Sequence, residues 1–85
     1  MSTFVTERAV TAAAVADLGG DLLALRGIAT AMTANGQHVQ ILHATYVPTH
    51  QTCLCVVDAD DAATVLEALR RAGTHTVRVL PALDL

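Results

Sequence analysis

The sequence has no lysine and no tryptophan, and it contains a single phenylalanine and a single tyrosine in 85 residues. Its five cationic side chains are all arginine, and its formal net charge is −3. A protein that binds nucleic acid needs clustered positive charge, and a protein that binds single strands also uses aromatic side chains on which bases stack. We therefore expect no nucleic-acid partner.

Long apolar runs are also missing. No stretch approaches the roughly 18 consecutive apolar residues that make a transmembrane helix, so we expect no membrane partner. The first residues, Met1 to Glu7, lack the basic region and the apolar core of a secretory signal. The two cysteines, Cys53 and Cys55, are expected to be reduced thiols. Together these features predict a cytoplasmic protein.

Charged residues are scarce, at 15% of the chain, whereas globular domains average about 25%. Apolar residues make up 53%. The length predicts one domain, residues 1–85, and a monomer of this size buries only roughly 60–65% of the surface of its unfolded chain. With so little polar side chain to cover a lone domain, we expect a buried interface and hence a homodimer.

Period-2 and period-3.6 hydrophobic patterns alternate along the chain. They predict the β-α-β-β-α-β order of a ferredoxin-like α+β fold, an antiparallel sheet with two helices on one face. Gly19-Gly20 is expected to break the chain before the first helix, and the Ala-rich stretch ahead of it is left open as a short helix or a loop. The expected strands are 3–9, 38–47, 52–58 and 75–80, and the expected helices are 21–34 and 61–72.

Both expected helices have an apolar stripe and recognisable ends. Asn35-Gly36 ends the first helix, and Asp21 at its beginning suits the helix dipole. Asp60 is the expected N-cap of the second helix, and Gly73 ends it. The expected buried stripes are Leu22, Leu25, Ile28, Ala29 and Met32 in the first helix, and Val65, Leu66, Leu69 and Ala72 in the second.

The expected second strand predicts how the sheet is covered. Neither of its sides is strongly charged, although the outer face of an antiparallel sheet is usually polar where it meets water. A second copy covering this open face would explain the pattern, and the two facing sheets would form a barrel-like assembly. One side would carry Val39, Ile41, His43, Thr45 and Val47, and the other side His38, Gln40, Leu42, Ala44 and Tyr46.

The second and third strands form a hairpin whose register stays open. A three-residue turn would place His43 opposite Cys55, on one face. A four-residue turn would instead place Tyr46 opposite Cys53 and Ala44 opposite Cys55. A slip of one residue exchanges every face, so the choice decides which polar side chains meet.

Candidate chemistry rests on histidine, thiol and carboxylate groups. Imidazole and thiolate suit divalent ions such as nickel, zinc and copper, although no high-specificity metal spacing is present. Glu7, in the middle of a strand, is expected either to pair with Arg78 or to act as a pocket base or metal ligand. His50 is expected to be solvated in the turn.

Four segments give the chain a family resemblance: Val5–Arg8, Ile41–Val47, Cys55–Asp60 and Arg70–Gly73. It resembles a family of small bacterial ferredoxin-like proteins, first described as a domain of unknown function, with a member described as nickel-binding. The sequence differs from that family at Ile41, where tryptophan is usual.

The resemblance implies a homodimer, a ferredoxin-like fold and a bound Ni(II) ion. Four positions look like the motif residues of the family: Glu7, His43, Tyr46 and Cys55.

Three functions follow as hypotheses. The first is a small dimeric divalent-metal protein, with nickel preferred and His38, His43, Cys55 and Glu7 as candidate ligands. The second is a cofactor-free enzyme subunit of isomerase, cyclase or oxygenase type, with a small apolar ligand in its cavity and Glu7, His43 and Tyr46 as acid/base candidates. The third is a structural or regulatory module without a site of its own.

Overall fold

The computed structural model describes residues 2–74 and 78–83. It has the predicted α+β class, with two α-helices and a four-stranded antiparallel sheet of strand order β2-β3-β1-β4. No helix in this part of the chain is both long and apolar enough to span a bilayer. The elements are β1 (Ser2–Ala9), the 3₁₀ turn η1 (Ala12–Ala14), α1 (Val15–Ala34), β2 (Val39–Val47), the 3₁₀ turn η2 (Pro48–His50), β3 (Thr52–Ala59), α2 (Ala62–Arg71) and β4 (Arg78–Ala82).

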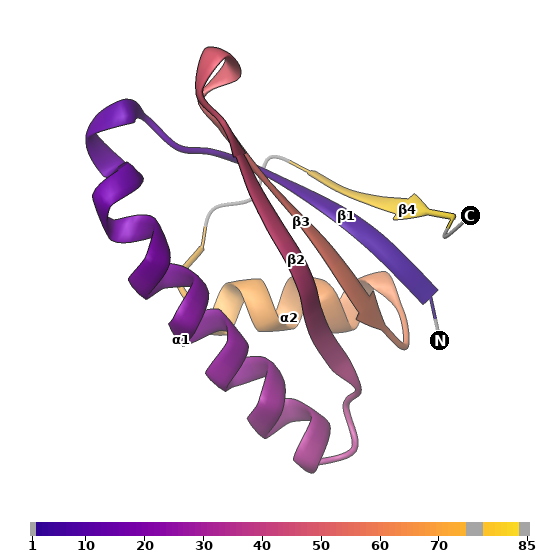
Figure 1. The fold of residues 1–85 in the computed structure, drawn as a ribbon. Coiled ribbons are helices and arrows are strands. Elements are labelled where there is room, and N and C mark those ends of the chain that lie inside the picture. Colours follow the sequence, from indigo (N-terminus) through magenta and orange to yellow (C-terminus); the bar gives the residue numbers. More distant parts are fainter. Residues whose placement is uncertain (1, 75–77, 84–85) are drawn as a thin grey trace.

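The core lies between the two helices and one face of the sheet (Figure 1). Along β3 every second residue points into this core and is buried, as the pleat of a strand requires, and Phe4 and Thr6 of β1 do the same. Thr6 is the one buried polar residue among those described. The buried strand residues are Phe4 and Thr6 in β1, Val39 and Ile41 in β2, and Cys53, Cys55, Val57 and Ala59 in β3.

Helix α1 begins at Val15 and continues through Gly19-Gly20, so the predicted break there is wrong. Glycine in a helix interior costs about 1 kcal/mol relative to alanine. One apolar stripe runs across the two glycines at spacings of four and three residues, and its packing against the sheet outweighs that cost. The stripe consists of Leu18, Leu22, Leu25, Ala29 and Met32.

Because α1 begins early, Asp21 lies inside the helix and not at its N-terminus. Its carboxylate forms an ion pair with Arg8 of β1, with 3.0 Å between Oδ2 and Nη2. The predicted C-terminus of α1 is confirmed, since Asn35 is the C-cap and Gly36 has a φ of +89°.

The N-cap of α2 is Asp61 and not Asp60. The Asp61 carboxylate accepts hydrogen bonds from the backbone N–H of Thr64 at 2.8 Å and from its hydroxyl at 2.7 Å. Asp60 instead accepts from the backbone N–H of His38. Gly73, with a φ of +68°, ends α2 as predicted.

The buried face of α2 differs from the expected stripe at one position. Leu66 is 52% exposed, whereas Ala68 takes its place in the core beside Val65 and Leu69. Ala72 is partly buried against the same core.

Strand β4 pairs with β1 at an edge of the sheet. It contains Pro81, which an edge strand tolerates because the missing N–H can face solvent. Residues 75–77, where the sequence predicts that this strand begins, lie outside the described residues.

Strand β2 contains an irregularity in its pairing with β3 between Ile41 and His43. The extra residue, Leu42, exchanges the faces of the strand at this point, as a β-bulge does. Val39 and Ile41 therefore point into the core, whereas His43 and Thr45 point to the opposite face. The prediction that Val39, Ile41, His43, Thr45 and Val47 share one side is wrong for this reason.

Candidate functional site

The sheet has a second face, which no described helix covers (Figure 1). We call it the open face. Its central apolar side chains, Val5, Leu54 and Val56, remain partly exposed although they lie on the two inner strands. Across the four strands the open face includes Thr3, Val5, Glu7, Gln40, His43, Thr45, Leu54, Val56, Asp58, Arg78 and Leu80.

The polar side chains of the open face pair with one another. The Thr3 hydroxyl donates to the Asp58 carboxylate at 2.8 Å. His43 Nε2 lies 2.9 Å from the Thr45 hydroxyl, and the imidazole tautomer decides which group donates.

Glu7 is the carboxylate for which the sequence left two roles open. The structure confirms the pairing with Arg78, with 3.2 Å between Oε2 and Nε. The Glu7 carboxylate is therefore engaged with an arginine of the neighbouring strand.

The hairpin has the four-residue turn, with Gln51 in the left-handed conformation at a φ of +48°. Tyr46 lies opposite Cys53, and Ala44 lies opposite Cys55. His43 lies opposite Val56, so the three-residue alternative is wrong. The sheet therefore separates the imidazole of His43 from the thiol of Cys55.

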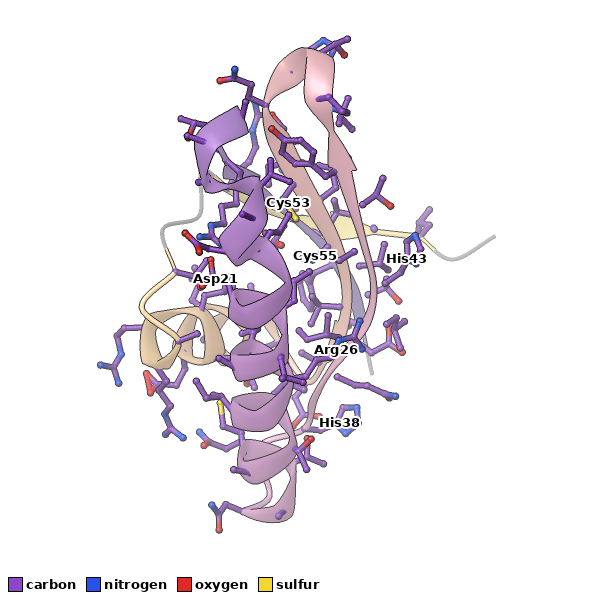
Figure 2. The ribbon with its side chains drawn as sticks, turned by 60° about the vertical axis from the view of Figure 1, so that its left-hand side comes forward. Asp21, Arg26, His38, His43, Cys53 and Cys55 are labelled. Carbon is purple, nitrogen blue, oxygen red and sulfur yellow. The ribbon has the colours of Figure 1, made fainter. Side chains whose placement is uncertain are left out.

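Both cysteines are free and buried under the helices, as Figure 2 shows for their side chains beside α1. Burial, followed by the neighbouring Cys55 thiol, raises the pKa of Cys53 from 9.0 to about 11, and the charge of Arg8 only partly opposes this. The Cys53 thiol therefore stays protonated at neutral pH. Since the thiolate is the metal ligand and the nucleophile, neither role suits Cys53.

Tyr46 lies on the core side of β2, and its hydroxyl donates to the backbone carbonyl of Val10 at 2.8 Å. This bond fixes the chain just after β1. Glu7 and His43 lie on the open face, so the three acid/base candidates of the enzyme hypothesis do not converge on one point.

His38 lies just before β2, whereas His43 lies within the strand, beyond the irregularity at Leu42 (Figure 2). Its Nε2 atom is buried and has no hydrogen-bond partner among the described residues. Within residues 2–74 and 78–83, no three His, Cys, Asp or Glu side chains lie close enough to hold a metal ion. A single copy of the described chain thus does not assemble His38, His43, Cys55 and Glu7.

Arg26 is a residue that the sequence analysis missed. It lies on the exposed side of α1 and donates from Nη1 to the backbone carbonyl of Ile41 at 3.1 Å. Among the described residues it forms no ion pair, whereas the other four arginines each pair with a carboxylate. No sequence signal identifies it, because a helical position does not tell which strand lies beside it.

Comparison of the chain with family models, with curated proteins and with solved structures gives no match. The resemblance to the nickel-binding family therefore stays a prediction.

Proposed function

We propose that this chain is a ferredoxin-like binding protein that works as a homodimer, with the open faces of two copies packed against each other. The observation that supports this most is the apolar centre of the open face. Val5, Leu54 and Val56 stay partly exposed on the inner strands, and no described helix of one copy covers them. Covering such a patch removes apolar area from water, which favours association.

The polar side chains of the open face support the same interface. A polar group can be buried at low cost only when it already has a hydrogen-bond partner. Thr3 is bonded to Asp58, Glu7 to Arg78, and His43 to Thr45. The face can therefore be covered without leaving these groups unpaired.

The ferredoxin-like assignment is part of the proposal. It is supported by the strand order β2-β3-β1-β4, in which every neighbouring pair is antiparallel. It is also supported by the placement of α1 between β1 and β2 and of α2 between β3 and β4.

Sedimentation equilibrium of the native chain and two variants tests the homodimer. Val56→Glu places a charge in the centre of the open face and is expected to give the monomer mass of 8.9 kDa. Leu23→Glu is the control, because Leu23 is 74% exposed on α1 and lies outside the proposed interface. The native chain and this control should both have twice the monomer mass. A native chain that stays monomeric, or a Val56→Glu variant that remains dimeric, would contradict the proposal.

A divalent metal, with nickel preferred, is the second candidate. The observation that favours it is that His43 and Glu7 lie on the same open face. Pairing two open faces would bring two copies of each side chain into one space, and imidazole with carboxylate suits such an ion. Cys55 and His38 are not part of this site, because Cys55 points into the core and His38 lies away from the face.

Calorimetric titration of the chelator-treated chain with nickel tests the metal site. Binding with proton release that is lost in His43→Ala would support it. The matched control is His50→Ala, since His50 is exposed in the turn η2. No nickel binding, or binding that survives His43→Ala, would contradict the metal site. Neither result would contradict the homodimer, which the sedimentation experiment tests separately.

The enzyme hypothesis receives less support from the geometry. Side chains fill the space between sheet and helices, and the cavity beside Cys53, Cys55 and Leu69 measures only about 10 Å³. Ligand sites usually measure about 300–1,000 Å³. This small cavity thus leaves no room for an apolar substrate.

A further inference from the structure

A larger cavity lies between α1 and the edge strand β2. It measures about 400 Å³, within the range of about 300–1,000 Å³ that is usual for small-molecule sites. Its wall on the α1 side is formed by Arg26, Ala29, Thr30 and Thr33, and its other wall by residues 38–41. Gln40, which lies opposite Asp58 at the edge of the open face, also lines the cavity, whereas the apolar centre of the open face does not.

The charge of this cavity is positive. Arg26 lines it, and no Asp or Glu is among the lining residues. The chain as a whole has a net charge of −3, and its other four arginines are held by carboxylates. Arg26 has one described hydrogen bond, to the Ile41 carbonyl, so most of its five N–H donors are free for a ligand.

A second polar side chain in the cavity wall, His38, has an atom without a partner among the described residues. Figure 2 shows the side chains of Arg26 and His38 near each other beside α1, and both line the cavity. The buried Nε2 atom of His38 has no hydrogen-bond partner among the described residues. A buried polar atom without a partner is costly, and this favours a turn of the imidazole toward the cavity, where a ligand atom can satisfy Nε2.

The rest of the wall is mixed, with Thr30, Thr33 and Gln40 beside three apolar side chains. Ala29, Val39 and Ile41 line the cavity and are all buried. A bare inorganic anion would leave these side chains without contacts. A ligand with an anionic end and an apolar body would use both parts of the wall.

We propose that this cavity binds a small organic carboxylate. The guanidinium of Arg26 holds the carboxylate by charge-assisted hydrogen bonds, for which its planar fork is suited. The Nε2–H of His38 donates to the same group, and the apolar body packs against Ala29, Val39 and Ile41. The proposal goes beyond the homodimer and the metal, because it uses none of the residues of the open face.

The test is a titration of the ¹⁵N-labelled native chain, followed by amide NMR shifts, with benzoate, hexanoate, benzamide and inorganic phosphate. Saturable shifts of residues 26–33 and 38–41 are expected with at least one of the two carboxylates. Benzamide and phosphate should bind at least roughly tenfold more weakly, because one lacks the charge and the other the apolar body. The proposal is overturned if neither carboxylate gives saturable shifts there, or if benzamide or phosphate binds equally well.

A matched pair of variants assigns the contact. Arg26→Gln should weaken carboxylate binding by about tenfold or more, since a hydrogen bond to a charged group is lost. Arg70→Gln removes the same charge from the exposed side of α2 and should leave the affinity unchanged. Equal affinities in both variants would overturn the role of Arg26. Arg26 also donates to the Ile41 carbonyl, so thermal unfolding of Arg26→Gln checks that this variant is still folded. The comparison of benzoate with benzamide uses the native chain and does not depend on any variant.

Discussion

Glu7 in β1 and Arg78 in β4 lie opposite each other in the sheet, and their side chains form an ion pair on the open face. In one copy the Glu7 side chain is 29% exposed and the Arg78 side chain 60% exposed. A pair in such a position contributes about 0.2–1 kcal/mol. If a second copy covers the open face, breaking the pair leaves a buried charge without a partner, which costs about 3–5 kcal/mol. The stability of Glu7 variants therefore reports on the covering of this face.

Glu7→Gln is expected to lower the free energy of unfolding of the dimer by about 3 kcal/mol or more. The matched control is Glu67→Gln, which breaks the ion pairs with Arg70 and Arg71 on the surface of α2. Urea denaturation at one protein concentration measures both. The control should have the smaller effect, and equal small effects of the two substitutions would mean that solvent still reaches Glu7.

The Cys53 thiol predicts how stability changes at alkaline pH. Its pKa is raised from 9.0 to about 11 in the folded chain, because burial and the neighbouring Cys55 disfavour the thiolate. Between these values the unfolded chain loses the proton and the folded chain keeps it, so stability falls as pH rises from about 9 to about 11.

Urea denaturation of the native chain and of Cys53→Ala at pH 8 and pH 10 measures this decline. Cys53→Ala should be less stable at pH 8, because a buried side chain is lost, but it should show a shallower decline towards pH 10. Parallel declines in both proteins would show that another group causes the change.

The N-cap of α2 gives a prediction at acid pH. Hydrogen bonds from the hydroxyl and the backbone N–H of Thr64 lower the pKa of Asp61. The stabilisation is therefore present at neutral pH and is lost as pH falls through this lowered pKa. Asp61→Ala should be less stable than the native chain at pH 7, and the difference should shrink with acidification.

Asp61→Asn distinguishes the capping hydrogen bond from the effect of the negative charge, because asparagine caps helices about as well as aspartate but carries no charge. It should keep most of the stability at pH 7. Thermal unfolding at several pH values measures all three proteins, and an Asp61→Ala variant as stable as the native chain would refute the assigned cap.

The periodic parts of the fold could be predicted from the sequence. Alternating patterns indicated the strands, and Asn35-Gly36 and Gly73 indicated where both helices end, because these signals are local. The beginning of α1 could not be predicted, since Gly19-Gly20 opposes a helix locally and only the packing of Leu18 and its stripe decides in favour of one. The irregularity at Leu42 likewise arises from pairing with β3, which the sequence of β2 alone does not determine.

The candidate site could also be predicted from the sequence only in part. The pairing of Glu7 with Arg78 could be predicted, because a carboxylate in the middle of a strand needs a cation and few cations are available. The cavity beside Arg26 could not be predicted, since it depends on how α1 crosses the edge of β2. The two walls of this cavity come from separate segments of the chain, and no local sequence pattern tells how the helix is oriented against the strand.

The homodimer is tested most directly by intermolecular nuclear Overhauser effects in a mixture of ¹³C-labelled and unlabelled chains. Effects between copies are expected from the methyl groups of Val5, Leu54 and Val56. The open-face homodimer is contradicted if these methyl groups show no contact with the other copy, or if the intermolecular effects arise instead from Leu23 on the outer side of α1.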